Sequence, residues 1–194
     1  VLVVVAALFT AISSTAALAV PVFVENPLAG TGNFTLIDNG DFEVNGGNGT
    51  QPTGWSDFAN FRGVWRASDE QSFLGNYSIK SAPNNFSGAG FTLFRNVVTI
   101  PGETYILSAY FYNVSLTNAQ FRIDNFPAPD NPDLGFGIAF PTESWVLGYD
   151  SFVASSTSTT IRIVMDGTVT SDQIMYVDGI GVTLASEFRA DAMP

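Results

Sequence analysis

Short runs of alternating apolar and polar residues dominate the chain after residue 24, and clusters of Gly, Pro, Asn and Asp separate them. Val, Ile, Thr, Phe and Tyr are frequent in these runs, as is typical of strands, and no window shows a sustained helical period. We expect strands at residues 64–67, 77–80, 90–98, 104–114, 119–125, 135–140, 145–153, 159–166 and 174–184. Runs of this length and spacing predict an all-β sandwich.

Alternation with a period of two assigns the faces of the most regular runs. The residues assigned to the core are Leu107, Ala109, Phe111, Ile161, Ile163 and Met165. Ser108, Tyr110 and Tyr112 fall on the opposite face of the run at residues 104–114. This run therefore has one apolar face and one face that is aromatic and open to water.

Residues 1–24 differ from the rest of the chain, because they hold no charged residue and are almost wholly apolar. Three interpretations stay open: a secretory signal cleaved after the small residues Ala17 and Ala19, a membrane-spanning helix, or an arm buried in neighbouring copies. We expect the arm, because apolar surface left in water costs about 25 cal/mol per Å². We expect residues 1–18 to be helical and residues 20–24 to be extended, able to complete a neighbour's sheet. The arm's assembly contacts would come from Val1, Leu2, Val5, Leu8, Phe9, Ile12, Val20, Val22 and Phe23.

The chain is thus divided into an N-terminal apolar arm (1–24), a linker (25–32), a β-sandwich (33–184) and a C-terminal tail (185–194). Pro27, Gly30 and Gly32 mark the linker, since Pro and Gly interrupt regular structure.

The composition excludes several kinds of chemistry. With 18 acidic and 7 basic residues the formal charge is −11, which repels phosphate backbones, so we expect no nucleic-acid partner. The chain has no Cys and no His, which removes Cys-His and Ser-His-Asp catalysis, disulfides, and metal sites built on thiolate or imidazole. Only cations that prefer oxygen ligands remain plausible.

Five Asn-x-Ser/Thr sequons point to a secreted, extracellular protein that carries covalent N-glycans. Such sequences also arise by chance in a chain rich in Asn, Ser and Thr. The predicted glycosylation sites are Asn33, Asn48, Asn76, Asn85 and Asn113.

Several short motifs follow one another in a familiar order: residues 39–43 (NGDFE), 54–55 (GW), 75–80 (GNYSIK), 100–108 (IPGETYILS), Trp145 and 176–182 (YVDGIGV). In this order they resemble the jelly-roll carbohydrate-binding modules of the cellulose- and xylan-binding type, over residues 33–184. The resemblance implies a jelly-roll sandwich. It does not extend to the apolar arm.

The resemblance also implies a structural Ca²⁺ bound by Glu43 and Asp178, with backbone carbonyls completing the shell. Gly179 stands where the family often has a second polar residue, so the shell is expected to be thinner. The alternative is that both carboxylates are solvated or are capped by backbone N–H groups.

Sugar binding in such modules relies on aromatic faces that stack on pyranose rings, with polar groups nearby. The candidate constellation is Trp65, Tyr110, Tyr112, Arg122 and Asp124. The alternative is that these residues pack under loops, contact another subunit, or lie beneath a glycan on Asn113.

We expect no enzymatic activity, because the paired acids at residues 69–70 and at Asp130 with Asp133 lie in turn-rich segments where acids are usually solvated. The leading hypothesis is a structural subunit of an extracellular, glycosylated, helical homopolymer, so that the main partner is a second copy of the chain. An apolar helix on a glycosylated sandwich is similar to archaeal type IV pilins and flagellins, although the acidic residue found near the start of bacterial pilins is missing. The alternative is a secreted carbohydrate-binding module with a cleaved signal, in which case glycans are the partner and a membrane is met only during secretion.

Overall fold

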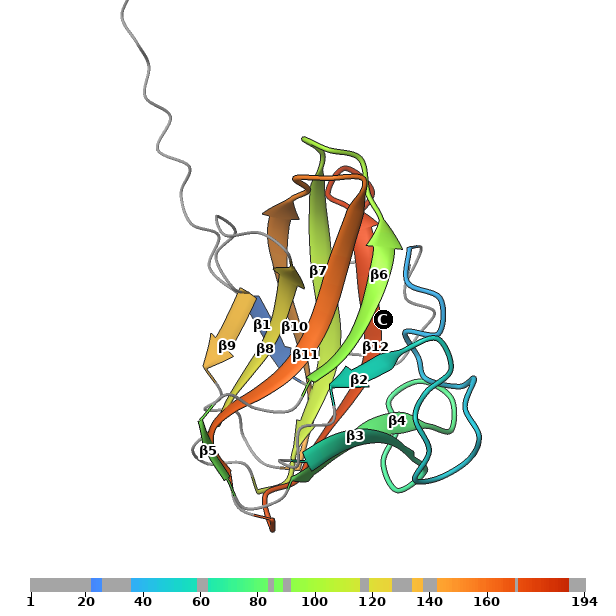
Figure 1. The fold of residues 1–194 in the computed structure, drawn as a ribbon, viewed down its shortest axis with the longest axis vertical. Coiled ribbons are helices and arrows are strands. Elements are labelled where there is room, and N and C mark those ends of the chain that lie inside the picture. Colours follow the sequence, from blue (N-terminus) through green and yellow to red (C-terminus); the bar gives the residue numbers. More distant parts are fainter. Residues whose placement is uncertain are drawn as a thin grey trace, which may run out of the picture.

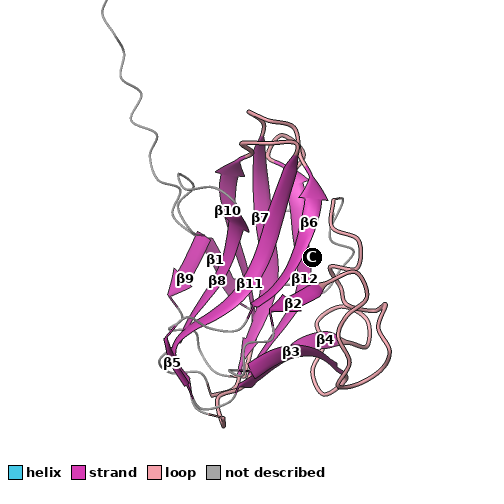
Figure 2. Ribbon diagram, in the orientation of Figure 1, coloured by secondary structure: helices cyan, strands magenta, loops and turns pink. Residues whose placement is uncertain are grey.

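The fold consists of two antiparallel sheets that pack face to face (Figure 1). The computed structural model describes residues 22–25, 36–58, 63–83, 86–88, 92–115, 119–126, 134–137, 143–169 and 171–188. Within these ranges the regular elements are all strands, as Figure 2 shows. The prediction of an all-β sandwich is therefore confirmed.

Sheet A contains, from edge to edge, β1 (Val22–Glu25), β10 (Trp145–Val153), β7 (Thr104–Asn113), β12 (Met175–Leu184), β4 (Ser78–Pro83) and β3 (Gly63–Ser68). Sheet B contains β2 (Ser56–Phe58), β6 (Thr92–Val98), β11 (Ser158–Val169), β8 (Ala119–Phe126) and β9 (Leu134–Gly137), and β5 (Phe86–Gly88) also pairs with β11. Most neighbours within a sheet are distant in sequence, so the chain passes repeatedly from one sheet to the other.

The core lies between the inner faces of the two sheets. Leu107, Ala109 and Phe111 of β7 are 0%, 0% and 1% exposed, and Ile161 and Ile163 of β11 are both 0% exposed. These five assignments from the alternating pattern are confirmed. Met165 lies in β11, but its side chain is outside the part of the structure that is described.

Every run expected to form a strand overlaps an observed strand, and the bounds of β10 match the expected residues 145–153. The turn before β7 places Gly102 in the left-handed region at φ 85°, which a glycine tolerates. The predicted strands did not include β2 and β5, because runs of 3 residues are too short to show alternation.

The N-terminal segment enters the structure at β1. Its residues pair antiparallel with β10 of the same chain, from Val22 opposite Tyr149 to Glu25 opposite Val146. Two of the residues assigned to an assembly arm, Val22 and Phe23, thus lie at the edge of sheet A. The other arm residues, Val1, Leu2, Val5, Leu8, Phe9, Ile12 and Val20, lie outside the described residues, as does the linker at residues 26–32. In the portion of the chain that is described, no helix is long and apolar enough to cross a membrane.

A bulge in β12 separates two faces of the same strand. The pairing between β12 and β7 shifts between Asp178 and Gly181, and Gly179 adopts φ 54°. The Ile180 N–H then donates to the Gly40 carbonyl at 2.9 Å instead of continuing the ladder. Because a bulge re-aims side chains, Ile180 enters the core while Asp178 lies on the outer face of sheet A, where its cross-strand partner is Tyr110.

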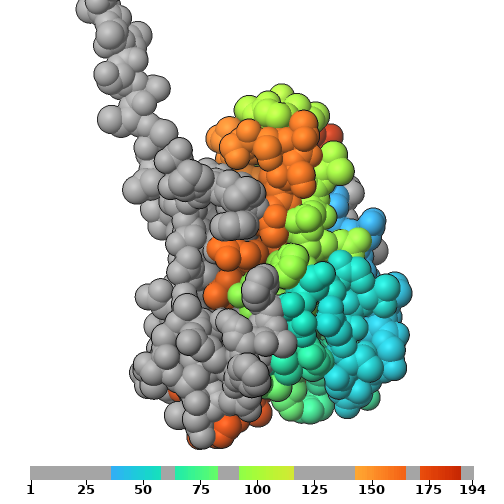
Figure 3. All heavy atoms as spheres, in the orientation of Figure 1, coloured from blue at the N-terminus to red at the C-terminus, as the bar shows by residue number. Residues whose placement is uncertain are grey.

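Two loop regions lie beside sheet A: residues 36–55, which precede β2, and residues 69–77, which connect β3 to β4. We call residues 69–77 the strap. Figure 3 shows the segment from residue 36 to β4, coloured blue to green, on one side of the lower half of the molecule. This is where side chains from loops and from sheet A can meet.

Truncation of the core should be costly. Replacing Leu107 with Ala removes a fully buried side chain from the centre of β7, so we expect the free energy of unfolding to fall by about 2–5 kcal/mol in denaturant titrations. The matched control is Val98→Ala at the end of β6, where the side chain is 79% exposed and the expected change is within about 0.5 kcal/mol. Equal losses in the two variants would contradict the assigned core.

Candidate functional site

A row of large side chains crosses the outer face of sheet A at right angles to the strands. Trp145 of β10 lies opposite Tyr112 of β7, and Tyr112 lies opposite Tyr176 of β12. Tyr176 in turn lies opposite Lys80 of β4, and Lys80 lies opposite Arg66 of β3. Directly opposed residues share a face of the sheet, so five strands contribute to one row.

The aromatic members of this row contact one another and receive a further ring from the strap. The ring centroids of Tyr112 and Trp145 are 5.4 Å apart, and those of Tyr112 and Tyr176 are 6.1 Å apart. Phe73 of the strap stacks on Tyr110 at 3.9 Å and lies 5.7 Å from Trp145. We call these five residues the aromatic cluster. Tyr110 and Tyr176 are buried, whereas Phe73, Tyr112 and Trp145 are partly exposed, so the cluster presents three rings to a ligand.

Hydrogen-bonding groups lie at one side of the aromatic cluster. The Lys80 ammonium donates to both carboxylate oxygens of Glu70 at 2.7 Å, and the Tyr176 hydroxyl donates to Glu70 Oε2 at 2.7 Å. The hydrogen bonds from Lys80 and Tyr176 lower the pKa of Glu70, so it is ionised at neutral pH. Burial, together with the Glu70 carboxylate, raises the pKa of Tyr176, which keeps the hydroxyl protonated. Glu70, Lys80 and Tyr176 form the polar trio.

The strap is held against sheet A by two carboxylates. Asp178 Oδ2 accepts the N–H groups of Phe73 at 2.7 Å and Leu74 at 2.8 Å, while Oδ1 accepts the N–H of Gly179 at 2.7 Å. Glu43 Oε1 accepts the N–H groups of Asn76 at 2.8 Å and Tyr77 at 2.7 Å. Glu43 and Asp178 therefore fasten successive parts of one loop.

These bonds bear directly on the predicted Ca²⁺ site at Glu43 and Asp178. A cation needs oxygen lone pairs, and N–H groups are directed at the carboxylate oxygens that would have to supply them. Among the described residues no group of three or more acidic side chains could hold a metal ion. The described geometry is that of the alternative, in which backbone N–H groups cap the carboxylates, and Ca²⁺ binding by Glu43 and Asp178 stays a prediction.

Two residues predicted to bind sugar are in the interior, so their predicted place on an open face is wrong. Trp65 is 0% exposed and belongs to the core. On β3 it points inward, whereas the next residue, Arg66, points outward. Tyr110 does lie on the outer face of sheet A, but Phe73 of the strap stacks on it and it is also 0% exposed. Of the aromatic candidates, Tyr112 alone is partly exposed.

Arg122 and Asp124 lie in the other sheet from Tyr112. They belong to β8, where Arg122 is opposite Val164 and Asp124 is opposite Arg162 of β11. Their grouping with Tyr112 is wrong, because the chain crosses to sheet B between β7 and β8. The structure therefore divides the predicted constellation between two sheets.

Sequence reasoning missed most of the residues that the structure brings together: Glu70, Phe73, Lys80, Trp145 and Tyr176. Trp145 and Tyr176 were noted only as parts of motifs. The one local signal was position: Trp145 is the first residue of β10 and Tyr176 is the second residue of β12. A large ring there lies near the end of the sheet. Phe73 and Glu70 lie in an irregular loop, for which alternation predicts nothing.

The described sequons differ in accessibility. Asn48 and Asn76 are exposed, and the Asn76 side chain makes only a long 3.4 Å contact to Glu43 Oε2. Asn113 is 2% exposed at the end of β7, which makes it the least accessible of the three described sequons, and glycosylation of all three stays a prediction. Asn33 and Asn85 lie outside the described residues.

Solved structures share this arrangement of strands, although neither a protein-family model nor a curated protein matches the sequence. TmCBM61, solved in complex with beta-1,4-galactotriose, has a TM-score of 0.55 and 11% identity, over 79% of this chain and 99% of that one. A family 16 carbohydrate-binding module has a TM-score of 0.53 and 19% identity, over 77% and 99%. The C-terminal family 22 carbohydrate-binding module of Clostridium thermocellum Xyn10B has a TM-score of 0.51 and 14% identity, over 75% and 96%.

The chain thus has the two-sheet β-sandwich fold of carbohydrate-binding modules. A cyclase from Fischerella sp. TAU is also similar, with a TM-score of 0.53 and 12% identity over 76% of this chain and 94% of that one. Since one fold hosts different functions, the function has to be argued from the side chains.

Asp178 should titrate far from the usual range. Burial raises its pKa from 3.8 to about 7, with a further contribution from Asp41, and the three N–H bonds lower it only in part. Because the folded pKa is the higher one, the contribution of Asp178 to stability is full below about pH 4 and is lost as the pH rises through about 7. Carboxyl ¹³C NMR should show a midpoint near 7, and Asp178→Asn should remove this part of the pH dependence of unfolding. A midpoint below 5 would contradict the assignment.

If the protein is N-glycosylated, the glycans should be found at Asn48 or Asn76 and not at Asn113, because only the first two side chains reach solvent. Peptide mapping by mass spectrometry of protein from a glycosylating host checks this, with Asn48→Gln and Asn76→Gln as controls. Full occupancy of Asn113 in folded protein would contradict the placement of its side chain.

Proposed function

We propose that this protein is a non-enzymatic carbohydrate-binding module and that the aromatic cluster with the polar trio is its ligand site. The observation that carries the proposal is the row from Trp145 through Tyr112 and Tyr176 to Lys80, which places partly exposed rings beside charged hydrogen-bonding groups. Aromatic faces bind the apolar faces of sugar rings, and polar side chains at their margin select the hydroxyl pattern.

The charges at the site favour a neutral glycan. The Lys80 ammonium is paired with the Glu70 carboxylate at 2.7 Å, and the Arg66 guanidinium is paired with Asp57 at 2.8 Å. Neither cation is therefore available to a uronate or sulfate group without losing its partner. The formal charge of −11 adds repulsion against any polyanion. Hydroxyl groups of a neutral sugar can instead bond the oxygen lone pairs of Glu70 that remain free.

The partners of Glu70 support a binding role over a catalytic one. Glycosidases generally need a pair of carboxyl groups that flank the scissile bond. At this site Glu70 has no carboxyl partner among the described polar contacts; its partners are Lys80 and Tyr176. Glu70 is thus held by an ammonium group and a hydroxyl group, an arrangement that suits binding.

We further propose that the protein is extracellular, as expected of a module that binds polysaccharide, and that the sequons at Asn48 and Asn76 support this location. The filament hypothesis rests on residues 1–24, of which only residues 22–24 are described. Those residues pair with β10 of the same chain, which a single binding module also explains. The binding module is therefore the leading proposal, and self-assembly through the N-terminal arm stays a prediction.

Removal of either exposed ring should weaken binding. We expect the protein to retain at least one neutral glycan from a panel of β-1,4-galactan, β-1,4-xylan and cellulose in affinity electrophoresis. Tyr112→Ala or Trp145→Ala should weaken that binding by roughly tenfold or more, because each variant removes a stacking face.

The matched control is Tyr149→Ala. Tyr149 is an aromatic residue on the same strand and face as Trp145, but it packs on Phe188 of the C-terminal segment at 5.0 Å, away from the polar trio. Its replacement should leave the affinity unchanged. The proposal fails if the parent protein binds no polysaccharide, or if all three variants weaken binding equally.

A further inference from the structure

The strap supplies two of the groups that form the proposed site. Phe73 lies over Tyr110 and beside Trp145, and Glu70 bonds to Lys80 and Tyr176. Both belong to residues 69–77, which have no strand ladder of their own. The position of these two side chains therefore depends on what holds the strap to the sheet.

Glu43 and Asp178 bind the backbone of the strap. Asp178 is 0% exposed and binds the backbone at Phe73 itself and at Leu74, so it fixes the residue whose ring completes the aromatic cluster. Glu43 binds the backbone two and three residues further on, at Asn76 and Tyr77. Four N–H groups of the strap are thus accepted by two side chains that come from outside it.

The packing around these bonds leaves the strap little freedom to shift. A Cβ on Gly179 would lie 2.8 Å from a ring carbon of Tyr110 and 3.0 Å from a methyl group of Leu74. A Cβ on Gly75 would lie 2.4 Å from the carboxyl carbon of Glu43. The strap therefore packs closely on the Glu43 carboxylate at Gly75 and, through Leu74, on the backbone at Gly179, which leaves it little room to shift.

We infer that Glu43 and Asp178 are positioning residues of the ligand site: they hold the strap at the depth where Phe73 stacks on Tyr110 and Glu70 reaches Lys80. The ligand part of this inference rests on the proposed carbohydrate binding, whereas the placement of the strap does not. The described contacts between these carboxylates and the strap are direct hydrogen bonds, which need no metal ion.

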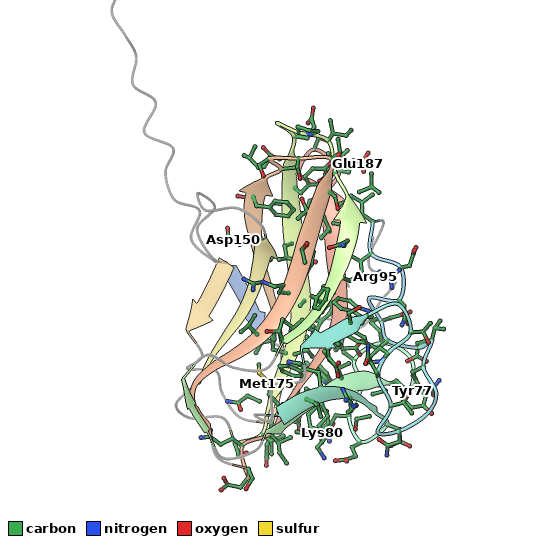
Figure 4. The ribbon with its side chains drawn as sticks, viewed as in Figure 1. Tyr77, Lys80, Arg95, Asp150, Met175 and Glu187 are labelled. Atoms are coloured by element: carbon green, nitrogen blue, oxygen red, sulfur yellow. The ribbon has the colours of Figure 1, made fainter. Side chains whose placement is uncertain are left out.

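The test compares Glu43→Ala with Glu43→Gln. The Ala variant removes the acceptor of two strap N–H groups, whereas the Gln variant keeps one carbonyl oxygen that can accept both. Its amide would face the exposed Asn76 side chain, which can rotate to present its oxygen. Glu43 is partly exposed, so its loss is less of a threat to folding than the loss of Asp178. Glu187→Ala is the matched control, because Glu187 lies at the opposite end of the sandwich from Lys80 (Figure 4).

The first measurement needs no ligand. Trp55 and Trp65 are 3% and 0% exposed, so acrylamide quenching of the folded protein reports mainly on the partly exposed Trp145, next to Phe73. Release of the strap in Glu43→Ala should raise the quenching constant. The constant should stay near the parent value in Glu43→Gln and Glu187→Ala. In a Trp145→Phe background, Glu43→Ala should no longer raise it. Circular dichroism at the same temperature confirms that each variant is folded.

The second measurement is the Kd for the glycan that the parent protein binds. We expect it to weaken roughly tenfold in Glu43→Ala and Asp178→Ala, and to stay within about twofold in Glu43→Gln. Unchanged quenching and unchanged Kd in folded Glu43→Ala would overturn the positioning role. A rise in parent quenching on addition of EDTA would also overturn it, because a cation would then be holding the strap. A parent that binds no glycan, but whose quenching responds to Glu43→Ala, would overturn the proposed function and support the positioning role.

Discussion

A buried carboxylate must find hydrogen-bond donors, and in this protein that requirement shapes the outer face of sheet A. Asp178 is removed from solvent and is next to no basic side chain among its described contacts; its partners are three backbone N–H groups. Two of them come from the strap, more than 100 residues earlier in the chain. The need of one side chain for donors therefore decides where a loop without regular structure lies.

The position of the strap changes the character of the sheet beneath it. Tyr110 and Tyr112 face the same side of β7, but the strap covers the first and leaves the second partly open. At the other end of the face, Phe188 of the C-terminal segment packs on Tyr149. Both coverings are local, so Tyr149 packs under Phe188 while Tyr112 and Trp145 stay partly exposed beside the polar trio. The strap and the C-terminal segment thus determine which part of this face stays accessible.

The sequence predicted the parts of this fold that depend on neighbours along the chain. Alternation in β7 and β11 located core residues, since that pattern is local. The pattern could not show that β7 lies beside β10 and β12 while β8 crosses to the other sheet, which is why Arg122 and Asp124 were wrongly grouped with Tyr112. Nor could it show that Phe73 covers Tyr110. Whether an outward-facing ring is open depends on contacts between distant segments.

The low identity to the solved modules, 11% to 19%, makes it informative to ask which side chains the fold itself requires. A sandwich needs apolar inner faces, and residues such as Leu107 and Ile163 meet that need in any sequence with this pattern. It does not need a salt bridge from Lys80 to Glu70, because an exposed ion pair contributes little to stability, nor does it need a row of rings on its outer surface. Side chains that the fold does not require, and that nevertheless converge from β4, β7, β10, β12 and the strap, are where a binding function should be sought. The glycan site proposed here consists of such side chains.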